Sequence, residues 1–116
     1  MTIRREHLDQ IDFSDVAEGI DLMPPVTPGE ILREDFMAPL GLSANALAKA
    51  LHVPPNRITA ILNGTRSITA DTALRLARYF NTTPQSWLNL QKNYELEVAK
   101  RTVGRAIEAE VEPHAA

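Results

Sequence analysis

The side chains best suited to chemistry lie between residues 43 and 67, where amides, hydroxyls and guanidinium groups fall at helix starts or on polar helix faces. Asn56, Arg57 and Thr59 occupy the exposed face of one short predicted helix. An arginine can pair with guanine, an asparagine with adenine, and a threonine can offer a hydroxyl or a methyl group. Polar groups at helix starts and in loops can hold phosphates. The full candidate DNA-binding set is Ser43, Asn45, Pro55, Asn56, Arg57, Thr59, Asn63, Thr65 and Arg66.

Residues typical of enzymes and metal sites are poorly represented. The chain has no cysteine, and its three histidines stand alone without metal-ligand spacing. The carboxylates of Glu30, Glu34 and Asp35 fall on the exposed side of a predicted helix, which favours a solvated face or a protein contact over acid–base catalysis. The sequence contains no glycine-rich phosphate loop and no serine elbow. We therefore expect a non-enzymatic protein with no cofactor and no metal.

The net charge of −3 over 116 residues hides a basic region. Residues 1–23 hold six acidic and two basic side chains, whereas residues 43–79 hold five basic side chains against Asp71 alone, a local charge of +4. Such a local basic surface favours a nucleic-acid partner. No apolar run approaches the roughly 18 residues of a membrane span. The N-terminus has no secretory signal, so the chain is expected to act in the cytoplasm and away from membranes.

Prolines and charge divide the chain into three predicted parts. Residues 1–23 form an acidic extension, residues 24–100 a domain with helical periodicity throughout, and residues 101–116 a helical extension with a frayed tail. Within the domain, helices are predicted over about 28–38, 43–51, 55–63 and 69–80, and from residue 83 towards residue 100. Val103, Ile107 and Val111 continue an apolar spacing of four, which favours a longer last helix, although Gly104 weakens it.

Local signals define where these helices begin and which sides they bury. Ser43, Thr69 and Thr83 are predicted N-caps, and Pro55 and Pro84 fit first turns, where a missing N–H costs nothing. His52 is expected to be a turn residue. The fourth helix is predicted to face the core with Ala73, Leu74, Ala77 and Phe80. The fifth helix carries the apolar residues Trp87, Leu88 and Leu90, and Trp87 and Tyr94 are expected to be core or dimer contacts.

The predicted helices over 43–51 and 55–63 are joined by about three residues and have their apolar positions on facing sides. This is the pattern of a helix-turn-helix, in which one helix crosses the DNA backbone and the next enters the major groove. The polar side of the second helix, Asn56, Arg57, Thr59, Ala60 and Asn63, is expected to be exposed. Helical bundles without a DNA role contain the same pair of helices, so the geometry alone does not show whether the protein binds DNA. The local basic charge and the polar face favour DNA.

The sequence also resembles a known family. The segments 28–32, 47–48, 63–66 and 69–77 look like the XRE class of λ-repressor-like helix-turn-helix proteins. The string Thr83-Pro84-Gln85-Ser86-Trp87-Leu88-Asn89-Leu90-Gln91 narrows the resemblance to the HigA/VapI-type antitoxins, over about residues 25–100. The resemblance implies an all-α fold, a five-helix λ-repressor-like domain, to which the sequence adds an acidic N-terminal extension and an extended C-terminal helix.

The resemblance further implies what the protein binds. It implies a homodimer that represses its own type II toxin–antitoxin operon (HigBA-like) and neutralises a small basic ribonuclease toxin of the HigB/RelE type. By position, Asn56, Arg57 and Thr59 would read bases, and Ser43, Asn45 and Arg66 would contact phosphates. Two departures bear on this transfer. Ala44 replaces a glutamine of many relatives and offers DNA only its backbone. The pair Pro54-Pro55 replaces the usual polar start of the second helix, so the resemblance does not define which bases this helix would contact.

Two other functions remain open at this stage. The chain could be a stand-alone XRE-family repressor without a toxin, or a protein-interaction module whose helix-turn-helix has lost DNA binding, for which Ala44 is the only support. The fifth helix and the apolar positions of 96–111 are the candidate dimer surface. The acidic extension is either a solvated segment or a docking segment for a basic toxin surface.

Overall fold

The computed structural model describes residues 23–115, and every element within this range is helical. In chain order the elements are α3 (Pro28–Ile31), η1 (Leu32–Met37), α4 (Ala38–Leu40), α5 (Ala44–Leu51), α6 (Pro55–Leu62), α7 (Ala70–Phe80) and α8 (Pro84–Glu110). The first three follow one another without a gap, so the predicted all-α fold of five helical segments is confirmed. The predicted extension of the last helix is also confirmed, because α8 passes residue 100 without a break.

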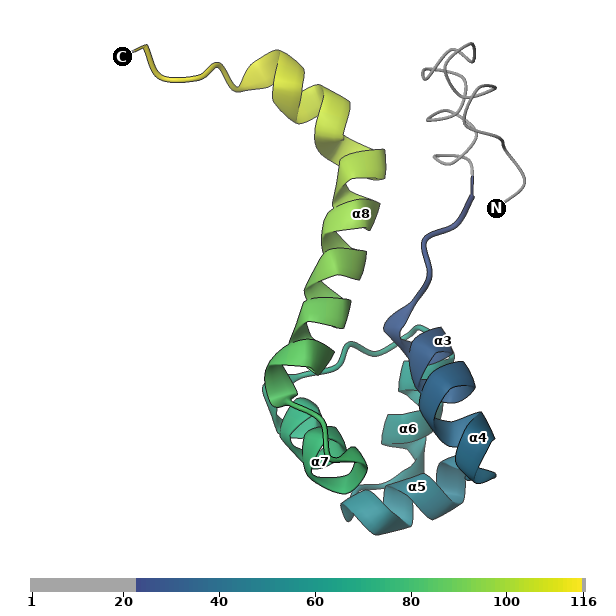
Figure 1. Ribbon diagram of the computed structural model, residues 1–116. Coiled ribbons are helices and arrows are strands. Elements are labelled where there is room, and N and C mark those ends of the chain that lie inside the picture. The colour runs from purple at the N-terminus through teal and green to yellow at the C-terminus, as the bar shows by residue number, and fades with distance from the viewer. Residues whose placement is uncertain (1–22, 116) are drawn as a thin grey trace, which may run out of the picture.

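Helices α3 to α7 gather at one end of the molecule, and α8 leads away from them towards the C-terminus (Figure 1). The predicted acidic extension lies outside the described residues except for Met23, whose carbonyl accepts a hydrogen bond from Arg101 in α8. None of the helices between residues 23 and 115 is both long and apolar enough to cross a membrane.

The predicted capping residues begin their helices. Ser43 Oγ accepts a hydrogen bond from the Ala46 N–H at 3.1 Å, and Thr83 Oγ1 accepts one from the Ser86 N–H at 3.2 Å. Each bond satisfies a backbone donor that the first helical turn leaves without a partner. Thr69 holds the N-cap position of α7, but its side chain makes no capping hydrogen bond.

The first helical segment is longer than predicted and contains a wide turn. In η1 the hydrogen bonds reach back five residues, as from the Ala38 N–H to the Arg33 carbonyl, which is the pattern of a π-helix. This turn lies directly before Pro39, a residue that has no N–H to donate and whose ring excludes the carbonyl four residues back. The segment therefore passes Pro39 and ends at Leu40, where Gly41 takes a left-handed conformation with φ of 64°.

The core differs from the prediction on one side of α7. Leu74, which was expected to be buried, is 60% exposed, and Phe80 is only partly buried. Leu76 takes the place of Leu74, because residues two apart lie on nearly opposite sides of a helix and only one can face the core. The buried side of α7 consists of Thr72, Ala73, Leu76 and Ala77.

Gly29 allows the first segment to approach α6 closely. A Cβ atom at this position would lie 2.1 Å from the Ile61 carbonyl oxygen and 2.9 Å from the Leu62 Cα. Both atoms belong to the backbone of α6, so they cannot move aside as a flexible side chain can. The contact therefore requires a residue without a side chain.

Gly29→Ala is expected to lower the free energy of unfolding by about 1–3 kcal/mol, the usual cost of an overpacked contact. Gly104→Ala is the matched control, because a Cβ there meets only the Lys100 Cβ at 3.9 Å. In this helix interior, alanine is expected to raise the free energy of unfolding by about 0.5–1 kcal/mol. Urea denaturation followed by circular dichroism measures both effects, and the same sign for both variants would contradict the close approach at Gly29.

Candidate nucleic-acid interface

α5 and α6 form a helix-turn-helix. His52 ends α5 in the left-handed conformation, with φ of 60°, and Pro54 is the extended N-cap of α6. The Val53 N–H donates to the Ala48 carbonyl at 3.0 Å, which closes the last turn of α5. The prediction that His52 is a turn residue is therefore confirmed. The facing sides of the two helices are buried and apolar, and they contain Leu47, Ala48, Leu51, Ile58 and Ile61.

The polar side of α6 is only partly exposed. Asn56, Thr59 and Asn63 are exposed as predicted, whereas Arg57 and Ala60 are partly buried and correct the prediction. The Thr59 hydroxyl donates within its own helix, with its oxygen 3.3 Å from the Asn56 carbonyl oxygen. Because this bond engages the hydroxyl hydrogen, Thr59 can offer a ligand only its methyl group and the lone pairs of its hydroxyl oxygen.

Arg57 is partly buried because an ion pair draws it towards α7. Its Nη1 lies 3.0 Å from Asp71 Oδ1, and the side chain is 24% exposed. The same Asp71 oxygen accepts a hydrogen bond from Arg75 Nε at 2.8 Å, and Arg75 Nη1 donates to the Leu51 carbonyl at 2.8 Å. Asp71 thus connects α6 to α7, and Arg75 connects α7 to the end of α5.

The hydrogen bond from Arg75, followed by the positive charges of Arg75 and Arg57, holds the pKa of Asp71 below its ordinary value of 3.8. The Asp71 carboxylate therefore binds a proton less readily in the folded state than in the unfolded state. The stability that Asp71 contributes is present above about pH 3.8 and is lost as the pH falls through the folded-state pKa.

We expect the free energy of unfolding of the native chain to fall more between about pH 5 and pH 3 than that of Asp71→Asn, because the variant lacks the titrating carboxylate. Urea midpoints at the two pH values measure this difference. Asp35→Asn removes another exposed carboxylate and controls for the change in net charge. Identical pH dependence of Asp71→Asn and the native chain would contradict the role of the ion pairs.

The candidate phosphate contacts lie around the two ends of the helix pair. Asn45 is exposed in the first turn of α5, next to the Ser43 cap. Thr65 follows α6 and donates its hydroxyl hydrogen to the Ala60 carbonyl at 3.2 Å. Arg66 is exposed in the loop between α6 and α7 and has no ion-pair partner among the described residues. Pro55 is exposed at the first position of α6.

Sequence reasoning missed two residues that support this surface. Asp71 counted only as a charge, although its spacing of four from Arg75 is a readable signal for a helical ion pair. Gln91 was part of the family string, but no signal showed its contact with the loop before α7. Its Oε1 accepts a hydrogen bond from the Ile68 N–H at 2.8 Å, across 23 positions of the sequence.

The arrangement of α5 and α6 defines a helix-turn-helix protein, and residues 32–87 match the family described as Helix-turn-helix. Virulence-associated protein I of Dichelobacter nodosus is 57% identical over 86 residues, which cover 74% of this chain and 80% of that protein. A solved HigA-family addiction module antidote protein from Coxiella burnetii is 58% identical with a TM-score of 0.76, over 79% of this chain and 100% of that one.

Pseudomonas aeruginosa antitoxin HigA, solved with the higBA promoter, is 45% identical with a TM-score of 0.76, over 78% of this chain and 99% of that one. The chain belongs to the HigA/VapI-type antitoxin family of XRE-type helix-turn-helix proteins. The resemblance drawn from the string around Trp87 is therefore confirmed.

Proposed function

We propose that this chain is a sequence-specific DNA-binding antitoxin that represses its own operon. The observation that carries the proposal is the set of exposed polar side chains on α6, Asn56, Thr59 and Asn63. The apolar side of this helix packs against α5, and the loop that follows it carries an exposed Arg66 with no partner among the described residues. A short helix fixed in this way can enter the major groove with its side chains towards the base edges. The P. aeruginosa HigA relative, solved with the higBA promoter, supports this reading.

Each candidate residue has a role in this proposal. Asn56 pairs with a base edge, and Thr59 offers its methyl group to a thymine. Arg57 also reads a base, either with Nη2, since Nη1 binds Asp71 and Nε is buried, or after its ion pair opens. Asn63 and Pro55 border the interface at the two ends of α6. Phosphates are held by Ser43, Asn45 and Arg66, and by Thr65 once its hydroxyl hydrogen turns from the Ala60 carbonyl towards the phosphate.

The protein partners form the second part of the proposal. We propose a homodimer joined through α8, because Leu96, Val103 and Ile107 are spaced by seven and four residues on one side of this helix. These three side chains are 56%, 45% and 50% exposed, so this side of α8 carries a row of apolar groups in water that a partner helix would cover. We further propose a small basic ribonuclease toxin of the HigB/RelE type as the molecule that is neutralised, because six acidic side chains in residues 1–23 complement a basic surface.

The test is a titration of the full chain onto its own upstream DNA and onto random duplex, at about 150 mM salt. Affinity for the upstream DNA at least about a thousandfold above random is expected for a repressor. Asn56→Ala is expected to lower affinity for the operator alone. Arg66→Ala is expected to weaken binding to both duplexes equally and to flatten the salt dependence by about one unit.

Arg105→Ala is the matched control for Arg66→Ala, because it removes an exposed arginine from α8, away from the helix-turn-helix. It is expected to leave both affinities unchanged. Equal, weak binding of the native chain to both duplexes would overturn the DNA proposal and favour a protein-interaction module. If the chain binds its operator but no gene for a small basic protein lies beside its own gene, a stand-alone repressor is favoured instead.

A further inference from the structure

The loop between α6 and α7 carries Arg66, and its two halves are held differently. The first half is tied to α6, because the Thr65 N–H donates to the Ala60 carbonyl at 2.9 Å. In the second half, the Ile68 side chain is buried, and its backbone N–H donates to Gln91 Oε1 at 2.8 Å. Among the described residues, this is the hydrogen bond that joins the loop to α8.

Gln91 is itself held in one orientation. Its side chain is 6% exposed, and its Nε2 donates to Glu95 Oε2 at 3.0 Å. Glu95 also accepts a hydrogen bond from Lys92 Nζ at 3.3 Å. If the amide of Gln91 were turned over, its oxygen would face a carboxylate and its NH₂ would face the Ile68 N–H. The two partners therefore fix which atom of Gln91 meets the loop.

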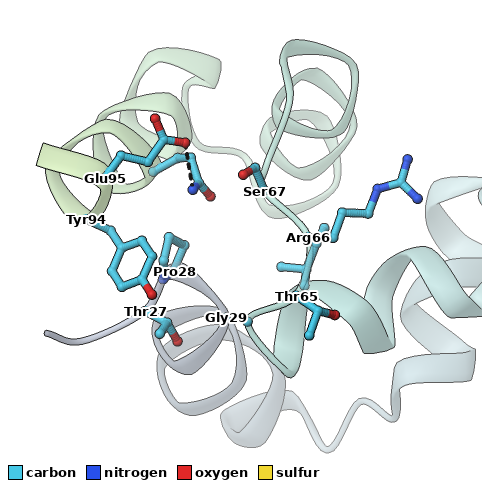
Figure 2. Close-up of a pocket in the computed structure, with 11 residues that line it drawn as sticks. Thr27, Pro28, Gly29, Thr65, Arg66, Ser67, Tyr94 and Glu95 are labelled. Carbon is cyan, nitrogen blue, oxygen red and sulfur yellow. Dashed lines mark hydrogen bonds between the residues drawn. The ribbon is translucent and has the colours of Figure 1, made fainter. Parts of the chain in front are cut away.

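Packing of the Ile68 side chain in the core also holds the second half of the loop, but Arg66 and Ser67 border a cavity that separates them from α8. This cavity has a volume of about 140 Å³ and lies among the loop, α8 and the start of the first helical segment, and its lining includes Ser67, Gln91, Tyr94, Glu95 and Thr27 to Gly29. Figure 2 shows the Tyr94 ring beside Pro28, while the Arg66 side chain extends away from the cavity. The part of the loop that carries Arg66 and Ser67 therefore has space to move towards α8 once the bond to Gln91 is lost.

We propose that Gln91 is a positioning residue for DNA binding, which sets the place of Arg66 by holding the Ile68 backbone. This inference rests on the proposed function, because it assumes that Arg66 contacts a phosphate. A loop that is already in place loses less conformational entropy on binding than a mobile loop does, so its contact with DNA costs less free energy. α8 then contributes to DNA affinity through its buried side, although Gln91 itself touches no nucleotide.

The test is Gln91→Met, which keeps a long unbranched side chain and removes the acceptor. We expect about tenfold weaker binding to operator and random DNA alike, with the salt dependence of the native chain, because Arg66 still reaches the phosphate but at a higher ordering cost. In an Arg66→Ala background, Gln91→Met is expected to have no further effect, because the side chain that it positions is absent. The double variant Gln91→Glu with Glu95→Gln keeps both hydrogen bonds, with the charge moved by one turn, and is expected to bind within about twofold of the native chain.

The outcomes separate this inference from the function on which it rests. If the native chain shows no preference for its operator, the proposed function fails. If the native chain prefers its operator while folded Gln91→Met keeps its affinity, or loses as much affinity with Arg66→Ala as without it, the positioning role is overturned. Circular dichroism establishes that each variant is folded at the temperature of the titration. If Gln91→Met does not fold, Gln91→Asn is used, because its amide is one methylene too short to reach Ile68.

Discussion

Trp87→Ala is expected to lower the free energy of unfolding by about 3–5 kcal/mol, the usual cost of emptying a large aromatic site in a core. Trp87 is 1% exposed, and the centroid of its ring lies 4.7 Å from the ring centroid of Phe36 and 6.2 Å from that of Phe80. It thereby joins α8 to the first helical segment and to the end of α7. Domains of this size are stable by about 5–15 kcal/mol, so this single change removes much of their stability.

Urea denaturation followed by circular dichroism measures the loss, because Trp87 is the one tryptophan of the chain and its fluorescence disappears with it. Thr82→Val is the matched control. Trp87 Nε1 donates to Thr82 Oγ1 at 2.7 Å, so this variant keeps the ring and leaves its N–H without an acceptor. It is expected to cost about 1–3 kcal/mol. A loss below about 1 kcal/mol for Trp87→Ala would show that the ring does not stabilise the core.

Ile107→Glu is expected to convert the proposed dimer into a monomer and to lower operator affinity at least about a hundredfold, because a dimer gains the affinity of two linked reading helices. Ile107 is 50% exposed on α8, so a carboxylate there is well solvated in a monomer and the fold is expected to persist. In a symmetric dimer the change occurs twice at one interface, where each charge loses water.

Sedimentation analysis measures the oligomeric state, and titration onto operator DNA measures the affinity. Ala109→Glu is the matched control, since it adds the same charge two residues further along, on nearly the opposite side of α8. It is expected to leave both measurements unchanged. A folded Ile107→Glu variant that remains dimeric would place the dimer interface elsewhere on the chain.

Most of the fold could be predicted because its signals are local. The hydroxyls of Ser43 and Thr83 and the first-turn proline Pro55 mark helix starts by chemistry within three or four residues. The buried side of α7 was predicted in part, since Ala73 and Ala77 were right and Leu74 was wrong. Two leucines compete for that side, and the choice of Leu76 depends on how the neighbouring helices pack around α7, which no local spacing encodes.

The site shows the same division between local and distant effects. The exposure of Asn56 and Thr59 follows from helical periodicity, and the sequence predicted it. The partial burial of Arg57 follows from Asp71, fourteen positions away, and the hydrogen bond of Gln91 to Ile68 spans a longer separation. Such contacts depend on the packing of whole helices, so a list of polar residues identifies the reading helix without showing which side chains are already engaged.

α8 continues without a break from Pro84 to Glu110, so the number of residues between two positions determines the angle between their side chains around the helix axis. Each residue of an α-helix adds about 100° of rotation and about 1.5 Å of rise. Trp87 in the core and Ile107 in solvent belong to this one helix, so the residues between them set how far the proposed contact surface stands from α6, and in which direction it faces. In a dimer joined through that surface, the length of α8 sets the distance and the relative rotation of the two reading helices. A one-residue insertion after Lys92 would turn the surface by about 100°, and the resulting dimer, although folded, would meet the two half-sites of its operator out of phase.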